Sequence, residues 1–362
     1  MSEAPIARVA VVGLGGIAQA AHLPAIASRR NAQLVGVCDV DAERRENFAA
    51  PDGDVVVTSS VDALLERAEP DIVTIATPPA SHVPIAIEAM EAGAWVLAEK
   101  PLCRSLAELD RLRAAEEATG NWCVTVSQFR YGSASRSLKR GLEQGRWGPA
   151  YAAAATTAWF RGDDYYAVPW RGRFETELGG VTISQAHHLI DLTCWLLGPW
   201  QSVVADARTV GRQIEVEDVS AAIVRFESGA VANLFSTVLS HRQHTDLAVH
   251  CRDATIELST LYEPADAEWR LTVADDDTDV LPIEGASTPA THGTQFSSLL
   301  DAWFRGRRPE LTVGEEREVV ELFTSLYRAA REGRRIHRGE VQASDPDYHA
   351  LAGGAAGGLH DG

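Results

Sequence analysis

A glycine-rich turn near the amino terminus constrains the fold of this 362-residue chain more than any other feature. The turn, Gly13–Ala18, has the pattern G-x-G-x-x-A and directly follows a short apolar run, Arg8–Val12. Its first glycine permits a tight turn, its second lets the backbone approach a pyrophosphate, and the alanine permits close packing of a helix on a strand. A turn of this kind between a strand and a helix is typical of a βαβ unit that binds a dinucleotide.

The next apolar run, Leu34–Asp39, ends in a carboxylate that can accept hydrogen bonds from the adenosine ribose of that dinucleotide. A 2′-phosphate would put negative charge beside Asp39, so NAD is favoured over NADP as the cofactor. The unpaired amides and the positive dipole end of the first helix are expected to face the phosphates. Around the turn, the residues expected to contact the cofactor are Gly13, Gly15, Gly16, Ile17 and Ala18.

Short apolar runs alternate with helical patterns over the first 128 residues, as in a parallel α/β sheet. The candidate strands are Arg8–Val12, Leu34–Asp39, Val55–Thr58, Ile72–Ala76, Trp95–Glu99 and Trp122–Ser127. A helix is expected over Leu106–Thr119, where leucines recur at near-helical spacing. We therefore expect residues 1–128 to form a Rossmann domain, with a doubly wound parallel sheet.

The pattern changes after Gly132, where an expected helix, Ala134–Gln144, is followed by extended segments in pairs. Pairs joined by short polar turns predict a large, mostly antiparallel open sheet. These pairs are Val219–Phe226 with Ala230–Val238, Leu247–Cys251 with Thr255–Leu258, and Trp269–Ala274 with Asp279–Ile283. Two helices close this α+β domain of residues 129–342, and the second begins with a possible capping box at Thr312–Glu315. Residues 343–362, rich in glycine and alanine, are expected to be a disordered tail.

Composition argues against several classes of function. The formal net charge of −18 argues against nucleic acid as a partner, because phosphate neutralisation needs a concentrated basic surface. No apolar run approaches the roughly 20 residues that span a bilayer, and the first residues lack the basic and apolar regions of a signal peptide. Five cysteines without a C-x-x-C pair favour reduced thiols, so we expect a cytoplasmic protein without a membrane partner.

Lys100 stands at the carboxyl end of a predicted strand, directly after Glu99, and Pro101 stops that strand. Ligands of open α/β sheets bind outside the carboxyl ends of the strands, so a lysine here is expected beside the reactive ring of the dinucleotide.

The segment Thr77–His82 follows the preceding strand at the same edge of the sheet. Thr77 and Pro78 are expected near the cofactor, whereas His82 either touches the cofactor or only begins the next helix. His22, in the first helix, is expected to cap or pack that helix.

Two adjacent histidines, His187 and His188, lie in a segment that leads into an apolar helix. In one continuous helix, Ser184, His188 and Asp191 share a polar stripe with Trp195, whereas His187 faces the core. A polar stripe is also typical of a solvated surface, so the spacing alone leaves the role of His188 open. No third ligand is evident beside His188 and Asp191, and no metal site is expected.

The combination of these motifs in this order resembles the glucose–fructose oxidoreductase / inositol dehydrogenase / MocA (Gfo/Idh/MocA) family over residues 5–340. The resemblance rests on Gly13–Ala18, Ala76–Pro79 with His82, Glu99–Pro101, and Gly179–Gly180 followed by His188-x-x-Asp191. It implies that Lys100 and His188 flank the substrate carbinol as an acid/base pair. The lysine–proline peptide is often cis in proteins of this family, so the resemblance also implies a cis peptide between Lys100 and Pro101.

The resemblance also implies further residues at the site. Trp170 and Arg171 are placed near cofactor and substrate, and Glu99 and Lys100 near the cofactor. The other residues expected at the substrate are Gln128, Tyr166, Ser184 and Asp191, with His241, Arg242, His244 and His292 as candidates for the pocket rim. One departure stands out, because many polyol dehydrogenases of the family carry aspartate where this chain has Ser184. Serine can form a hydrogen bond but cannot offset the charge of an imidazolium.

We therefore expect an NAD(H)-dependent oxidoreductase that acts on a CH–OH group of a sugar, cyclitol or sugar derivative. We expect it to assemble as a homodimer or homotetramer through its open sheet. Two alternatives remain open. One is a redox-assisted glycoside cleavage or elimination without net release of NADH, and the other is a non-catalytic NAD-binding regulatory protein. The presence of both Lys100 and His188 argues against the regulatory protein.

Overall fold

The chain folds into two compact units, seen in a computed structural model that describes residues 5–50, 54–259, 261–262, 268–273 and 288–351. The first unit comprises residues 1–103, 108–128 and 290–316, and the second comprises residues 104–107, 129–289 and 317–362. The predicted boundary after residue 128 separates Gln128 from Phe129. However, segment 290–316, which we expected in the second domain, belongs to the first unit.

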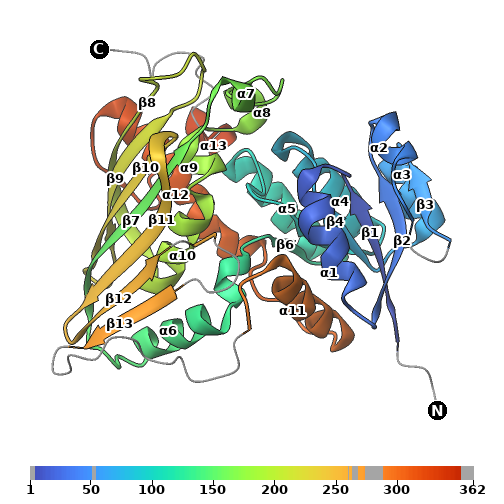
Figure 1. Cartoon of the computed structure of the whole chain (residues 1–362), viewed down its shortest axis with the longest axis horizontal. Helices are drawn as coiled ribbons and strands as arrows, with labels where there is room; N and C mark the ends of the chain where they lie inside the picture. The colour runs from blue at the N-terminus through green and yellow to red at the C-terminus, as the bar shows by residue number, and fades with distance from the viewer. Residues whose placement is uncertain (1–4, 51–53, 260, 263–267, 274–287, 352–362) are drawn as a thin grey trace. The chain divides into compact units, whose positions relative to one another are not determined.

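The first unit contains a six-stranded parallel sheet in the order β3-β2-β1-β4-β5-β6 (Figure 1). This is the strand order of a Rossmann fold, in which the order reverses between β1 and β4. The strands are β1 (Ala7–Val12), β2 (Ala32–Cys38), β3 (Val56–Thr58), β4 (Ile72–Ile75), β5 (Trp95–Ala98) and β6 (Cys123–Thr125). The predicted fold class of this part is confirmed, and each predicted strand is present with slightly different ends.

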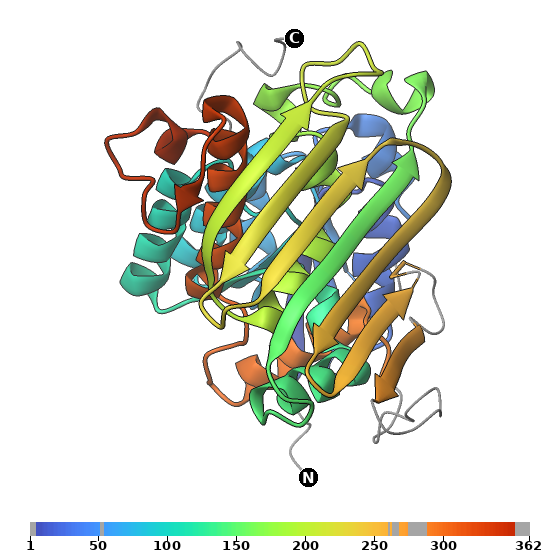
Figure 2. The same ribbon diagram turned by 90° about the vertical axis from the view of Figure 1, so that its left-hand side faces the viewer.

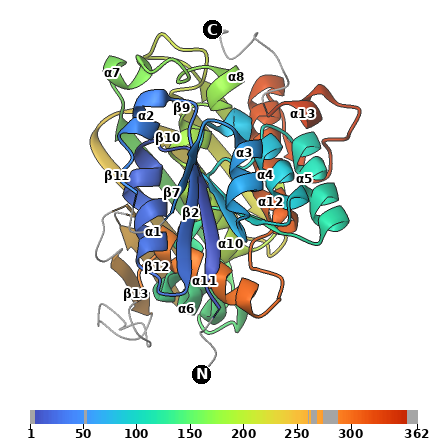
Figure 3. The ribbon, with the colours of Figure 1, turned by 90° about the vertical axis from the view of Figure 1, so that its right-hand side faces the viewer.

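Helices lie on both faces of the parallel sheet (Figure 3). Helix α1 packs against β2 on one face. Helices α3 and α4 contact each other and lie on the other face. Their bounds are η1 (Ala18–His22), α1 (Leu23–Ala27), α2 (Ala42–Glu46), α3 (Val61–Ala68), η2 (Pro79–Ser81), α4 (His82–Glu91), α5 (Leu106–Thr119) and α11 (His292–Phe304). Helix α11 contributes Phe296, Leu299 and Leu300 to the same buried cluster as Val11 and Leu97 of the sheet. This burial of apolar surface explains why the late segment 290–316 joins the first unit.

The second unit contains an eight-stranded sheet in the order β13-β12-β11-β7-β10-β9-β8-β14. Its strands are β7 (Ala150–Phe160), β8 (Trp200–Arg208), β9 (Val219–Phe226), β10 (Val231–Thr237), β11 (Leu239–Cys251), β12 (Ala254–Ser259), β13 (Glu268–Val273) and β14 (Ile336–His337). The pairs are antiparallel except for β7 with β10, which is parallel. The prediction of a large, mostly antiparallel sheet is therefore confirmed.

One face of this sheet is buried and the other is exposed. Along β9, buried residues such as Val224 alternate with exposed residues such as Ile223, which is the period expected of a half-covered strand. Figure 2 looks onto the exposed face, on which no described helix lies. The helices and turns that lie wholly or mostly in this unit are η3 (Gln128–Tyr131), α6 (Ser133–Glu143), α7 (Asp163–Tyr166), α8 (Phe174–Glu177), α9 (Val181–Ser184), α10 (His187–Leu197), α12 (Val313–Glu332) and α13 (Pro346–His349).

The carboxyl-terminal segment differs from the prediction. The expected strand Asp279–Ile283 lies outside the described residues, as does most of the tail expected from residue 343. The expectation of disorder is wrong for residues 343–351, which include α13. There the buried carboxylate of Asp347 accepts a hydrogen bond of 2.7 Å from Arg331, and Leu351 is buried as well. A buried ion pair and an apolar anchor thus hold a segment that glycine and alanine content alone assigned to disorder.

Candidate active site

The glycine turn of the first unit has the geometry that the motif predicts. Gly13 has a φ of +93°, and a Cβ there would lie 2.7 Å from the carbonyl oxygen of Ala76, so this position requires glycine. A Cβ on Gly16 would meet nothing within 4 Å, and one on Gly15 would meet only the Arg44 guanidinium, at 3.8 Å. The backbone at the start of the helix is therefore open to a ligand, as binding of a pyrophosphate requires.

Asp39 follows β2 and lies beside this turn. Its carboxylate is buried, with Oδ2 accepting the Leu14 amide at 2.7 Å and Oδ1 accepting the Asp41 amide at 2.9 Å. The Arg44 guanidinium lies 3.4 Å from Oδ2. Next to these residues is a hollow of about 450 Å³, lined by Leu14, Gln19, Asp41, Glu43, Arg44 and Asn47. A fixed acid, an open glycine turn and an adjacent hollow fit the ribose and phosphates of a dinucleotide.

His82 lies between the loops that follow β4 and β5. The side chain is fully buried, and its Nδ1 and Nε2 lie 2.9 Å from the Pro101 carbonyl oxygen and 2.8 Å from that of Thr77. Burial lowers the pKa of His82 below its ordinary value. With both ring nitrogens engaged, His82 joins the loop after β4 to the loop after β5. His82 begins helix α4, and its contact with the cofactor stays a prediction.

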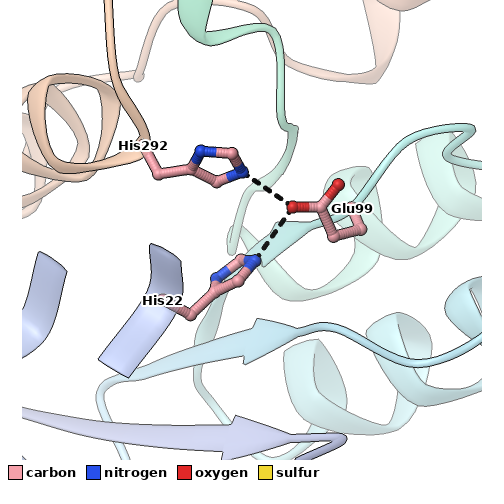
Figure 4. A group of neighbouring side chains, drawn as sticks. All are labelled: His22, Glu99 and His292. Atoms are coloured by element: carbon pink, nitrogen blue, oxygen red, sulfur yellow. Dashed lines mark hydrogen bonds and ion pairs between the residues drawn. The ribbon is translucent and has the colours of Figure 1, made fainter. Parts of the chain in front are cut away.

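Glu99, at the end of β5, binds two histidines that the sequence did not connect with it (Figure 4). His22 Nε2 lies 3.0 Å from Glu99 Oε1, and His292 Nε2 lies 2.9 Å from the same oxygen. Burial opposes ionisation of this carboxyl, but the hydrogen bonds from the two imidazoles hold its pKa well below the usual value. The other oxygen, Oε2, accepts the Lys100 amide at 3.3 Å. The Lys100–Pro101 peptide is cis.

His22 therefore does more than cap or pack its helix, which was the prediction. It ends the π-helical turn η1 with its side chain buried against Glu99, while His292 begins α11. Together with Glu99 these histidines are the one group among the described residues whose ligand atoms lie close enough to hold a metal ion. His22 is 77 positions from Glu99 in the sequence and His292 is 193 positions from it. No local sequence pattern could therefore reveal the cluster.

In the second unit, the Gly179–Gly180 pair is required by packing. A Cβ on Gly180 would lie 1.8 Å from the carbonyl oxygen of Glu217, and one on Gly179 would lie 2.2 Å from the Tyr327 hydroxyl. The buried Glu217 carboxylate accepts the amides of Gly180 at 2.9 Å and Thr182 at 3.0 Å, and the Tyr327 hydroxyl at 2.9 Å. Burial raises the pKa of Glu217. Glu217 thus fixes the start of α9, which sequence reasoning did not anticipate.

Ser184 and His188 do not lie on one continuous helix. Helix α9 ends at Ser184 and α10 begins at His187, so the predicted stripe is interrupted between them. The Ser184 hydroxyl donates to Glu177 Oε1 at 2.8 Å. Glu177 is 2% exposed and also accepts the Gly172 amide at 2.6 Å and the Arg171 guanidinium at 3.1 Å. A carboxylate therefore lies next to position 184, as in relatives with an aspartate there, but in this chain Glu177 supplies it.

Aromatic rings surround Arg171. Its guanidinium lies 3.8 Å from the ring centre of Tyr165 and 4.2 Å from that of Trp170, within cation–π range. Tyr165 also accepts a hydrogen bond of 2.8 Å from the Gln185 amide and packs edge-on against Tyr166. The segment predicted to lie near cofactor and substrate is thus a network of paired side chains.

The two adjacent histidines have different surroundings. His187 is fully buried against Phe323, as expected of a core residue. His188 is also buried, and its ring packs edge-on against Phe129 at 5.3 Å. Asp191, expected at the substrate, binds Arg130 with both carboxylate oxygens, one of them 2.8 Å from Nε. Gln128, also expected at the substrate, is buried.

A glycine turn with an acid at the next strand end, in a sheet of this order, defines a dinucleotide-binding α/β protein. Residues 7–127 match the family described as "oxidoreductase family, NAD-binding Rossmann fold", and residues 135–257 match the Gfo/Idh/MocA C-terminal domain. The chain belongs to the Gfo/Idh/MocA oxidoreductase family, as its motifs predicted. It is an NAD-dependent enzyme of the dehydrogenase/reductase class, which argues against the regulatory alternative.

Several relatives are similar over most of the chain. D-apiose dehydrogenase of Paraburkholderia graminis is 26% identical over 96% of this chain and 93% of the relative. A scyllo-inositol 2-dehydrogenase (NAD(+)) of Bacillus subtilis is 29% identical over 66% of this chain and 69% of the relative. The WlbA dehydrogenase of Bordetella pertussis, solved with NADH and UDP-GlcNAcA, is 30% identical with a TM-score of 0.80, covering 92% of this chain and 98% of that structure. Within the described part of the chain, no helix has the length and apolar character needed to cross a membrane.

Proposed function

We propose that the protein transfers a hydride between NAD and a secondary alcohol or ketone of a sugar, a cyclitol or a sugar derivative. The observation that carries this proposal is the setting of Lys100, a half-buried lysine directly after β5 in the unit that holds the glycine turn. Strand ends of this kind are where Rossmann folds bind their ligands. The relatives named as D-apiose and scyllo-inositol dehydrogenases support a carbohydrate-like substrate.

In this proposal, Lys100 donates a hydrogen bond to the reacting oxygen and stabilises the negative charge that develops on it during oxidation. His188 accepts the hydroxyl proton as general base. When bound, NAD accepts the carbinol hydride at C4 of its nicotinamide ring. Glycines 13, 15 and 16, with Asp39, bind and orient the dinucleotide.

The amino-acid composition adds support for Lys100. Only two of the 33 lysine and arginine residues are lysines, Lys100 and Lys139. An ammonium is a compact point charge whose pKa responds to burial, whereas a guanidinium stays protonated and presents a wide planar fork. A chain that uses arginine at nearly every cationic position but lysine after β5 is therefore consistent with a chemical role for that amine.

The test is a panel of polyols, sugars and sugar derivatives assayed with NAD and with NADP. We expect NADH to accumulate with a member of the panel, and Lys100→Met or His188→Asn to lower turnover by about 10² to 10⁴-fold. Affinity for NADH should stay within a few-fold. Lys139→Met is the matched control, because Lys139 pairs with Glu143 on α6 and stands outside the proposed site.

Near-wild-type turnover in either site variant would refute the assigned roles. Conversion of a glycoside without net NADH would instead indicate the redox-assisted cleavage that the sequence left open.

We also infer a homodimer or homotetramer formed through the exposed face of the eight-stranded sheet. Large apolar side chains lie exposed there on neighbouring strands: Ile223 on β9, and Val231 and Phe235 on β10. Exposed apolar patches on a sheet favour association with a second copy. A cytoplasmic location is proposed from the cysteines, all five of which carry free thiols.

A further inference from the structure

The backbone on both sides of Lys100 is anchored by buried polar groups of the first unit. On the amino-terminal side, Glu99 Oε2 accepts the Lys100 amide at 3.3 Å. On the carboxyl-terminal side, His82 Nδ1 lies 2.9 Å from the Pro101 carbonyl oxygen. The backbone of Lys100 is thereby held on both sides. The contact with the Lys100 amide is fixed only if the Glu99 side chain is itself held in place.

Two imidazoles hold the Glu99 carboxylate. His22 Nε2 and His292 Nε2 converge on the same oxygen, Oε1, at 3.0 and 2.9 Å (Figure 4). A buried carboxyl without such donors would take up a proton, because burial disfavours its charged form. Hydrogen bonds to the charged form reverse that preference. The negative charge of the carboxylate lies directly next to Lys100 in the chain.

The ligand atoms of the same three side chains are also close enough together to hold a metal ion, so hydrogen bonding and metal binding are competing uses of this cluster. Distances of 2.9 and 3.0 Å between nitrogen and oxygen are those of N–H···O bonds. An Nε2 that donates its proton to Glu99 has no lone pair left for a metal ion. The two rings also meet edge-on, with centres 5.4 Å apart, so that both Nε2 atoms can approach one oxygen.

We propose that His22 and His292 are positioning residues for Lys100 that act through Glu99. They keep the carboxylate ionised and fixed at the end of β5, where its charge favours the ammonium form of Lys100 and its Oε2 orients the Glu99–Lys100 peptide. Among the residues that the structure describes, the charged or titratable groups around Glu99 are His22, His82, His292 and Lys100. This inference rests on the proposed role of Lys100 in the reaction.

The scarcity of lysine makes a direct measurement possible without a substrate. In a Lys139→Arg background, reductive methylation with ¹³C-formaldehyde labels Lys100 and the amino terminus only. The pKa of the methylated amine is then read from its carbon shift against pH. We expect Glu99→Gln to lower the pKa of Lys100 by about one unit, because a neighbouring negative charge is removed.

Two pairs of histidine variants separate positioning from packing. His22→Leu and His292→Leu remove a donor, so Glu99 becomes protonated more easily and the pKa of Lys100 should fall in the same direction as in Glu99→Gln. His22→Gln and His292→Gln keep an amide donor near the position of Nε2. In these variants the pKa of Lys100 should therefore stay close to its wild-type value. Gln295→Leu is the matched control on α11, since Gln295 is buried and bonds to Thr125 and Ser127 but does not bond to Glu99. It should lower stability and leave the pKa of Lys100 unchanged.

An unchanged or raised Lys100 pKa in the folded leucine variants would overturn the proposal, as would an equal shift in Gln295→Leu. Zinc, manganese and iron(II) salts added to the intact protein form a further arm. Stoichiometric metal binding that is lost in His292→Leu would also overturn it, in favour of a metal site. The NMR result does not depend on turnover. Failure of the proposed function, seen as an active Lys100→Met variant, can therefore be distinguished from failure of the positioning role, seen as an unchanged Lys100 pKa.

Discussion

The substitution Ser184→Asp restores the aspartate that many polyol dehydrogenases of this family carry, and the structure predicts that it destabilises this protein. Ser184 Oγ lies 2.8 Å from Glu177 Oε1, and Glu177 is buried. A second carboxylate at this position would face the first in a site with little water. Two like charges about 4 Å apart repel by roughly 4 kcal/mol at an effective dielectric constant near 20, which is an upper figure. The nearby Arg171 guanidinium, 3.1 Å from Glu177, offsets part of this repulsion.

The cost depends on pH in a defined direction. In the folded variant one of the two carboxyls has a pKa raised above its unfolded value of about 4, because the pair cannot easily carry two charges. The folded state then binds more protons than the unfolded state at intermediate pH, so stability rises as pH falls. The destabilisation is therefore full above the raised pKa and disappears as pH falls toward about 4.

Urea unfolding of Ser184→Asp and Ser184→Asn at several pH values between 5 and 8 measures this effect. Asn has the same shape without the charge, and each variant loses only about 0.5–1.5 kcal/mol from the missing serine hydrogen bond. The double variant Glu177→Gln/Ser184→Asp has a carboxylate at position 184 and a neutral amide at position 177. Because only one charge remains, it should recover most of the lost stability. Equal stability of the Asp and Asn variants at pH 7.5 would refute the reasoning, because it would mean that Glu177 does not face position 184.

Two further outcomes follow from the same structure. Asp39→Ala should reduce the preference for NAD over NADP by at least about tenfold, measured as the ratio of kcat/KM values, because the charge that repels a 2′-phosphate is removed; a wild-type enzyme equally efficient with both cofactors would contradict this role. Phe235→Asp places a charge on the exposed sheet face and should convert the proposed oligomer to a monomer in analytical ultracentrifugation, whereas Ser228→Asp in the exposed turn after β9 should not; an unchanged mass for Phe235→Asp would exclude that face as the interface.

Local signals predicted the fold where tertiary contacts agree with them. The bounds of Leu106–Thr119 and Val219–Phe226 match the structure. Buried and exposed residues alternate along Val219–Phe226, which is the period of a half-covered strand. Strand β7, Ala150–Phe160, was not predicted, because its alanine-rich sequence favours a helix in isolation. Pairing with β10 on one side and β11 on the other overrides that preference.

The site shows the same division between local and distant information. The glycine turn and Asp39 are read from one βαβ unit, and their geometry agrees with the motif. The partners of Glu99, Ser184 and Asp191 could not be predicted, because His292, Glu177 and Arg130 reach them through tertiary folding. The stripe that linked Ser184 to His188 assumed an unbroken helix, which the turn between α9 and α10 rules out.

The late position of α11 in the chain has a consequence for synthesis. Strands β1 to β6 are complete by residue 125, but the helix that carries His292 and Phe296 follows only after the whole sheet of the second unit. At about 5–20 residues per second, the nascent first unit waits roughly 8 to 33 seconds for that helix. During this interval its apolar surface is incompletely covered and Glu99 has only one of its two histidines. A chain cut short before α11 therefore emerges with an unfinished cofactor-binding unit, exposed to chaperones and proteases.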